Sequence, residues 1–241
     1  MNPIVIIPTY NEKENITKML QKVMSLEPKF DVLVVDDDSP DGTASLVKDQ
    51  QKAFDRIHLL ENGEKNGLGT AYIAGFKWCL ERYYPYIFEM DCDFSHNPDD
   101  LIRLYSELQK SSVDMVVGSR YVGNVVNVVN WPMTRVLLSY FASAYVRFFT
   151  RMNLADSTAG FVGYTNNLLS TIDLDKIKFR GYAFQIEMKY TAYRLGRHIS
   201  EVPIIFTDRT AGESKMNGGI IKEALFGVVR LRFKKIRPKT Q

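Results

Sequence analysis

The sequence predicts an α/β fold in which a mostly parallel sheet carries helices on both faces. Strand-like and helical segments alternate five times between residues 4 and 118, the order typical of a parallel sheet. The strand-like segments are short continuous apolar runs, such as 4–7 and 32–35, which are typical of buried strands. Hydrophobic residues make up 45% of the 241 residues, enough for a large core. We therefore expect one domain spanning residues 1–241.

The elements of the first half are well marked. Apolar runs predict strands at 4–7, 32–35, 57–60, 86–90 and 115–118, and helical spacing predicts helices at 14–24, after 43, at 67–82 and at 98–108. The second half is less regular: a loop-like stretch at 121–134, helical spacing at 137–148, a strand at 201–206 and a basic amphipathic helix at about 217–237.

Polar clusters follow three of the predicted strands. They lie at residues 8–12, 36–38 and 91–93. Because parallel crossovers share one hand, the carboxyl ends of these strands meet at one edge of the sheet, where open α/β sheets bind ligands. We therefore expect the three clusters to converge on one cleft.

Asp91 and Asp93 are the strongest local signal for a metal. Two carboxylates directly after a buried strand are costly unless a positive partner joins them. Mg²⁺ or Mn²⁺, held together with diphosphate oxygens, is such a partner. The alternative is a solvated turn before the helix at Pro98, but the position on the ligand edge favours the metal. Asp37 is expected to bind a nucleobase or ribose, while its neighbours shape the turn.

Basic residues in the second half suggest an anion site beside this cleft. They are Arg120, Arg135, Arg209 and Lys215, each a solvated surface charge if taken alone. The net charge of +3 does not by itself imply nucleic acid, and we expect none. Gly67 and Gly69 lack the full dinucleotide-binding fingerprint, so they predict close packing of a helix onto the sheet.

Six motifs in order resemble those of family 2 glycosyltransferases. Within that family they are most similar to the dolichyl- or polyprenyl-phosphate mannose synthases. The resemblance covers roughly residues 3–216 and rests on residues 8–12, 36–43, 66–72, 90–96, 156–161 and 208–215. It implies a GT-A fold, an inverting reaction with Mg²⁺ or Mn²⁺, and transfer of mannose from GDP-mannose to a polyprenyl phosphate.

The resemblance also implies residue roles. Asp91 and Asp93 would hold the metal, and Asp93, Arg120 and Lys215 would serve catalysis. Arg120 and Arg135 would contact the acceptor phosphate. The nucleotide-sugar would be bound by Pro8, Tyr10, Glu12, Val35, Asp37, Asp91, Cys92, Asp93, Arg120, Arg209 and Lys215.

A phosphate acceptor suits a site without a strong base. The second pKa of a phosphate monoester is near 6, so this acceptor is already anionic at neutral pH. A sugar acceptor would need a base, for which Asp156 and Glu187 are the candidates. A UDP-glucose-dependent enzyme acting on a polyprenyl phosphate and a nucleotide-sugar-binding protein without turnover stay open as alternatives.

The sequence also predicts peripheral attachment to a membrane. No signal peptide is apparent, and the longest apolar charge-free segment, Val136 to Val146, has 11 residues, whereas a membrane span needs about 20. We expect a cytoplasmic protein on the cytoplasmic face of a membrane, with a separate anchoring partner left open. The anchor would be the C-terminal helix, with its stripe of Ile221, Ala224, Leu225, Val228 and Val229 and its basic end. The helix at 137–148 would guide the lipid.

Overall fold

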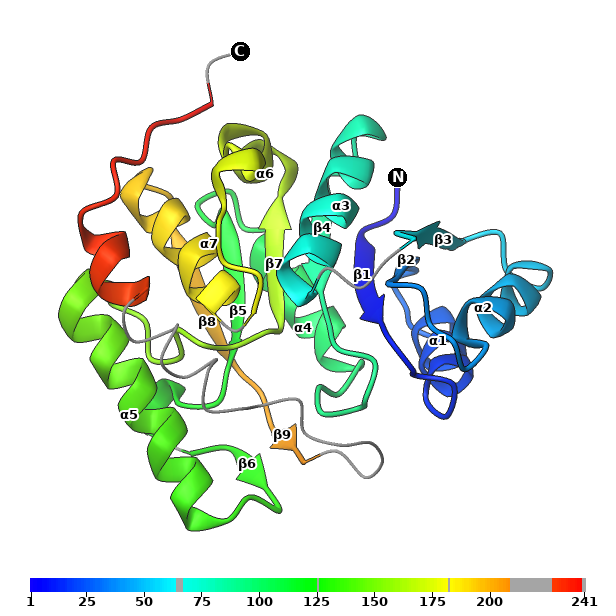
Figure 1. Cartoon of the computed structure of the whole chain (residues 1–241), viewed down its shortest axis with the longest axis horizontal. Helices are drawn as coiled ribbons and strands as arrows, with labels where there is room; N and C mark the ends of the chain where they lie inside the picture. The colour runs from blue at the N-terminus through cyan, green and yellow to red at the C-terminus, as the bar shows by residue number, and fades with distance from the viewer. Residues whose placement is uncertain (64–66, 125, 182, 209–226, 240–241) are drawn as a thin grey trace.

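The computed structural model describes residues 1–63, 67–124, 126–181, 183–208 and 227–239. Within these ranges, seven strands form one sheet in the order β3-β2-β1-β4-β7-β5-β8 (Figure 1). The bounds are β1 Ile4–Thr9, β2 Asp31–Asp36, β3 Ile57–Glu61, β4 Tyr86–Glu89, β5 Met115–Ser119, β7 Val162–Thr165 and β8 Ile199–Pro203. β7 is antiparallel to both neighbours, and every other pair is parallel.

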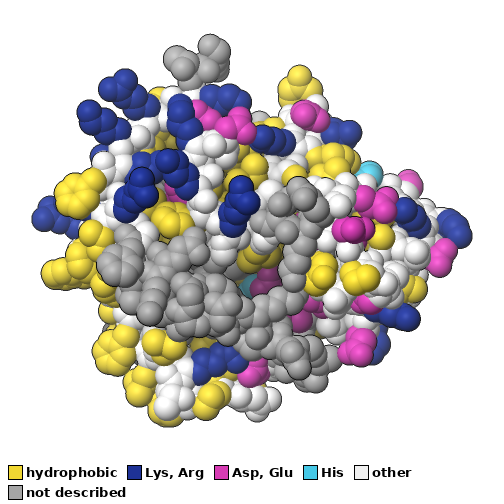
Figure 2. Space-filling view, viewed as in Figure 1, with side chains coloured by type: hydrophobic (Ala, Val, Ile, Leu, Met, Phe, Trp, Pro, Cys, Tyr) yellow, Lys and Arg dark blue, Asp and Glu magenta, His cyan; other side chains and the backbone are white. Residues whose placement is uncertain are grey.

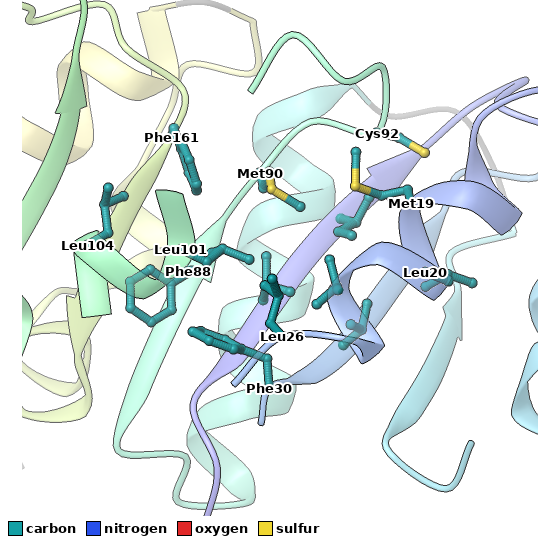
Figure 3. Packing of buried hydrophobic residues seen from close by; sticks show 14 of the residues in the cluster. Met19, Leu20, Leu26, Phe30, Phe88, Met90, Cys92, Leu101, Leu104 and Phe161 are labelled. Atoms are coloured by element: carbon teal, nitrogen blue, oxygen red, sulfur yellow. The ribbon is translucent and has the colours of Figure 1, made fainter. Parts of the chain in front are cut away.

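Helices cover both faces of the sheet, as predicted. α1 (Ile16–Met24), α2 (Thr43–Gln51) and α4 (Asp100–Leu108) pack in one core, and α3 (Leu68–Glu81), α6 (Asn166–Thr171) and α7 (Ala183–Arg194) pack in the other. Side chains alternate along a strand, so Val5 and Ile7 of β1 enter the first core and Ile4 and Ile6 the second. Figure 3 shows the first core, with Met19 and Leu20 of α1 among its side chains.

The second half contains elements that the sequence patterns did not predict. β7 inserts between β4 and β5 and continues into α6, and α7 follows the short 3₁₀ helix Leu174–Lys176. The predicted strand at 201–206 is wrong as a single element: β8 ends at Pro203, and β9 (Phe206–Thr207) pairs with β6 (Val128–Val129) in a second sheet. A further 3₁₀ helix, Val122–Asn124, follows β5.

α5 (Met133–Thr150) begins inside the predicted loop and turns its apolar side outward. Its buried residues are Ser143, Val146 and Thr150. Its exposed stripe, called here the α5 stripe, consists of Met133, Leu137, Tyr140, Phe141 and Phe148, which are 42–79% exposed. No helix in the described ranges combines the length and apolar character that crossing a membrane requires.

The C-terminal helix (residues 227–232) packs on α5 and α7. Its Val228 and Leu231 are buried in a cluster with Val146 of α5 and Tyr190 of α7. The prediction that Val228 faces lipid is therefore wrong: this part of the stripe meets protein. The other predicted stripe residues before it, at 221–225, lie outside the described residues.

Candidate active site

The acidic strand ends converge on one edge of the sheet, as expected from the alternation of elements. β1 lies between β2 and β4 and is parallel to both. The loops after β1 and β2 are joined by hydrogen bonds: the backbone N–H groups of Asn11, Glu12 and Lys13 donate to the side chains of Ser39, Thr43 and Asp41. The two loops therefore form one surface at this edge of the sheet. Pro8, Tyr10 and Glu12 are partly exposed on it.

The three successive acids after β2 have different surroundings. Asp36 is buried and accepts hydrogen bonds from Thr9 Oγ1 and from the N–H and hydroxyl of Ser39, so it shapes the turn. Asp37 is nearly buried and accepts one from Asn62 Nδ2 at 2.9 Å. Asp38 is exposed, with a positive φ of 59°. Val35 is fully buried in the core, so only its backbone can meet a nucleoside.

Asp91 and Asp93 lie just beyond β4, partly exposed, while Cys92 between them is buried in the first core (Figure 3). Because the buried Cys92 stands between them, both carboxylates are left partly exposed at this edge of the sheet. Asp93 Oδ1 accepts the N–H of Ser95 at 3.0 Å. Among the described residues, no three His, Cys, Asp or Glu side chains group as a complete metal site. Two oxygen donors suit a hard divalent cation whose remaining ligands come from a diphosphate.

The buried side chain of His96 supports the loop that carries Asp91 and Asp93. It is fully buried, its ring packs against Phe161 and Phe206, and its Nδ1 accepts the N–H of Asp91 in a long contact of 3.5 Å. Burial lowers the pKa of His96 to about 4, against the opposing charge of Asp93. A neutral imidazole is the form that can accept this N–H.

Gly160, in the segment before β7, lies next to Asp91 and His96. A Cβ on Gly160 would lie 4.0 Å from Asp91 Oδ2 and 3.8 Å from the His96 ring. Tyr72 of α3 is a third neighbour: burial and the charge of Asp91 raise its pKa well above the usual value. Residues from α3, β4 and the segment before β7 thus surround Asp91.

Arg120, just after β5, is buried and paired with Asp156. Its Nε and Nη2 donate to the two carboxylate oxygens at 2.6 and 2.7 Å, and Nη2 also donates to Thr158 Oγ1. Burial alone would raise the pKa of Asp156, but the charge and hydrogen bonds of Arg120 outweigh it and lower that pKa. The predicted role of Arg120 at a phosphate therefore has to coexist with a bidentate ion pair.

Arg135 joins the same region through Trp131. Its guanidinium donates to both oxygens of Asp208 at 2.9 Å and lies 4.1 Å from the Trp131 ring centroid. The guanidinium of Arg120 lies 5.6 Å from the same ring. The two predicted phosphate-contacting arginines are thus brought together around one tryptophan. Arg209 and Lys215 lie outside the described residues.

A buried polar row on α7 lies behind the cleft, and sequence reasoning missed it. Lys189 donates to the Ala159 carbonyl at 2.7 Å, and Gln185 donates to Glu89 at 2.6 Å. Burial raises the pKa of Glu89 and lowers that of Lys189. The row holds the segment before Gly160 in place. The sequence signal that could have revealed this row is the pair of polar residues at 185 and 189, which are one helical turn apart.

The glycines at the start of α3 serve close packing, but not against the sheet as predicted. A Cβ on Gly69 would lie 2.8 Å from the Phe179 carbonyl oxygen and 2.9 Å from the Phe184 ring. Gly69 also donates its N–H to the Arg180 carbonyl. The partner is the segment leading into α7. Gly75, one turn and a half later, is the glycine that packs on Ile6 of the sheet.

A mostly parallel sheet with acidic clusters at the carboxyl ends of β1, β2 and β4 is an arrangement that binds ligands at this edge. The model of the family described as "Glycosyl transferase family 2" matches residues 4–177. The chain belongs to this family.

Two curated relatives match almost the whole chain. An undecaprenyl-phosphate mannosyltransferase of Micrococcus luteus is 46% identical over 95% of this chain and 93% of its own length. A polyprenol monophosphomannose synthase of Mycolicibacterium smegmatis is 44% identical over 93% of this chain and 84% of its own length.

Solved structures agree on the fold. Glucosyl-3-phosphoglycerate synthase from Mycobacterium tuberculosis, solved with Mn²⁺, UDP and glucosyl-3-phosphoglycerate, superposes with a TM-score of 0.69 over 96% of this chain and 79% of its own. A second structure of that enzyme, with Mn²⁺, UDP-glucose and phosphoglyceric acid, gives a TM-score of 0.67 over the same shares. Sequence identity is 14% and 15%, so the likeness shows the fold alone.

Proposed function

We propose that this protein transfers mannose from GDP-mannose to a polyprenyl monophosphate, with inversion at the sugar and with Mg²⁺ or Mn²⁺. The observation that carries the proposal is the match to two mannosyl-transferring relatives over 93–95% of the chain. In the reaction an acceptor phosphate oxygen bonds to the sugar's anomeric carbon while the bond to the diphosphate breaks and GDP leaves. One displacement of this kind inverts the anomeric centre.

The geometry of two carboxylates favours a phosphate acceptor over a sugar acceptor. Asp156 is fully buried and bidentately paired with Arg120. Glu187 is also buried and accepts the N–H groups of Lys178 and Phe179 and the ammonium of Lys234. Neither is positioned to take a proton from a hydroxyl, so the two candidate bases for a sugar acceptor are both otherwise engaged. A phosphate needs no such base.

In this proposal, Asp91 and Asp93 hold the cation and Asp37 meets the nucleoside. Arg120 and Arg135, on either side of Trp131, attract the acceptor phosphate. A bound divalent cation would stabilise the charge that develops on the diphosphate. The manganese in the related solved structures supports a metal here.

The test uses purified protein with GDP-mannose and UDP-glucose as donors and a polyprenyl phosphate as acceptor. Asp93→Asn is expected to lower transfer by about 100-fold or more, since one coordinating charge contributes several kcal/mol at the transition state. Asp99→Asn, an exposed acid at the start of α4, is the control and should stay within about twofold. Full transfer by Asp93→Asn, or in excess chelator, removes the metal-dependent mechanism. Glucose transfer in place of mannose removes the donor assignment.

We also infer that the protein sits peripherally on a membrane, at its cytoplasmic face, because the acceptor is a lipid. The α5 stripe supports this, because it leaves large apolar side chains exposed along one side of the helix. α5 carries no Asp or Glu. Figure 2 shows hydrophobic side chains gathered on the lower left of the molecule, over α5. Exposed apolar surface of this kind marks an interaction site.

A further inference from the structure

We propose that a groove beside the C-terminal helix binds the phosphate headgroup of an anionic membrane lipid. The groove has a volume of about 650 Å³ and lies between the segment before α7, α7 itself and the C-terminal helix. Its lining residues are Lys178, Phe179, Glu187, Gly227, Arg230, Leu231, Phe233 and Lys234. None of them belongs to the acidic cleft. The inference deepens the membrane part of the proposed function and rests on it.

The groove carries net positive charge. Its one acid, Glu187, is buried and fully engaged: Oε2 accepts two backbone N–H groups and Oε1 accepts Lys234 Nζ at 2.5 Å. Lys178 and Arg230 are exposed and form no ion pair with any described residue. Two cations are therefore left to attract an anion. A phosphate monoester or diester held between lysine and arginine side chains is the matching group.

The apolar part of the lining distinguishes a lipid from a free anion. Phe179 and Leu231 form part of the wall, and a Cβ on Gly227 would lie 2.5 Å from the Phe179 ring. Phe233 at the rim is 80% exposed, which is unfavourable in water but typical of the apolar side of a helix that lies in a membrane interface. Cations beside an exposed aromatic ring match the boundary between headgroups and acyl chains.

The groove and the α5 stripe are carried by elements that pack on one another. Val228 and Leu231 fix the C-terminal helix on Val146 of α5, so groove and stripe belong to one packed unit. Figure 2 shows Lys and Arg side chains gathered at the upper left, over the C-terminal helix and the extended segment that follows it in Figure 1. No acidic residue follows Glu223 in the sequence, so the C-terminal segment itself contributes only positive charge to this surface.

The test measures co-sedimentation of the full chain with vesicles of phosphatidylcholine, with and without phosphatidylglycerol. Lys178→Gln with Arg230→Gln is expected to weaken binding to the anionic vesicles by about tenfold or more. The control, Arg237→Gln with Lys239→Gln, removes the same charge from exposed tail residues outside the groove. It is expected to change binding by about twofold at most. If both double variants lose vesicle binding equally, or if neither loses it, the groove is not the lipid-binding site.

Two further arms separate the possible outcomes. Inorganic phosphate at constant ionic strength should not release the protein from anionic vesicles, and release would mean that the groove takes free phosphate and not a lipid. Transfer to a short-chain, water-soluble polyprenyl phosphate should be unchanged in the groove double variant, because no groove residue lies in the acidic cleft. A wild-type protein that binds anionic vesicles through the groove but transfers no mannose would contradict the proposed function and leave the groove standing.

Discussion

At the scale of single residues, charged side chains at the cleft are held by partners far away in the sequence. Arg120 and Asp156 are 36 residues apart, and Lys189 and the Ala159 carbonyl are 30 apart. Each contact satisfies a group whose burial alone would be costly. The ion pair and the lysine together fix the segment that places Gly160 against Asp91. Positioning of the acids therefore depends on residues that touch no substrate in the proposed reaction.

Arg120→Ala should impair both stability and transfer. Removing the guanidinium leaves Asp156 buried without its partner, which costs about 3–5 kcal/mol of unfolding free energy. Transfer should fall at least about tenfold, because the charge-assisted contact that we propose between Arg120 and phosphate is lost as well. Urea unfolding and steady-state kinetics measure the two effects.

The double variant Arg120→Ala, Asp156→Ala separates the effect on stability from the effect on transfer. It should recover part of the stability, since no buried charge is left unpaired, but none of the transfer. Kinetics unchanged for both substrates in the single variant would mean that Arg120 serves structure only.

His96 should make the metal-free protein sensitive to acid. Burial lowers its folded pKa to about 4 from a usual 6.5, so between these values the unfolded chain binds a proton that the folded chain does not. Unfolding free energy should therefore fall as pH drops from 6.5 to 4. His96→Asn keeps an acceptor near the Asp91 N–H and should flatten this part of the curve. The measurement is urea unfolding in the presence of chelator between pH 6.5 and pH 4. If unfolding free energy falls equally with pH in the wild type and in His96→Asn, His96 is not the group responsible.

At the scale of elements, α5 shows that helical spacing does not tell which side of a helix is buried. Its apolar residues follow a 3.6-residue period, yet the side that packs on the protein contains Ser143 and Thr150. Thr150 satisfies its hydroxyl within the helix by donating to the Val146 carbonyl at 2.6 Å. A helix can thus bury a small polar residue such as Thr150 at little cost and leave its larger apolar side for another surface.

Polar substitution in the α5 stripe should weaken membrane binding without destabilising the fold. Leu137→Gln with Phe141→Gln replaces side chains that are 47% and 62% exposed, so unfolding free energy should change by about 0.5 kcal/mol or less per site. Vesicle binding should fall several-fold, as apolar area is lost from the interface. Tyr83→Gln, 81% exposed at the far end of α3, is the matched control. Equal vesicle binding by the stripe variant and wild type would show that the stripe faces another partner.

At the scale of the whole molecule, the C-terminal segment belongs to the folded domain. It contributes Val228 and Leu231 to a buried cluster, and its Lys234 neutralises Glu187 and also donates to the Lys176 carbonyl. The Lys239 N–H donates to the Thr171 carbonyl at the end of α6. The tail is therefore tied to the protein at several points, and its Arg230 lines the groove described above.

Truncation should reveal how much the C-terminal segment contributes to the stability of the domain. A chain ending at Met216 loses two buried aliphatic side chains, and their removal should lower unfolding free energy by about 3–6 kcal/mol. A chain ending at Ile236 keeps that cluster and should unfold at nearly the wild-type denaturant concentration. Urea unfolding of the three lengths measures this, and identical midpoints for all three would show that the C-terminal helix contributes no stability.

The alternation of strands and helices, and the acids placed directly after three strands, were determined by the sequence alone. These are local signals: period-two or apolar runs define strands, and the hand of parallel crossovers brings Asp37, Asp91 and Asp93 to one edge. The tertiary structure alone decided that β7 enters the sheet between β4 and β5, that Asp156 neutralises Arg120, and that the α5 stripe faces outward. Each of these depends on a partner distant in sequence, which no local pattern specifies because pairing and burial arise only when the whole chain packs.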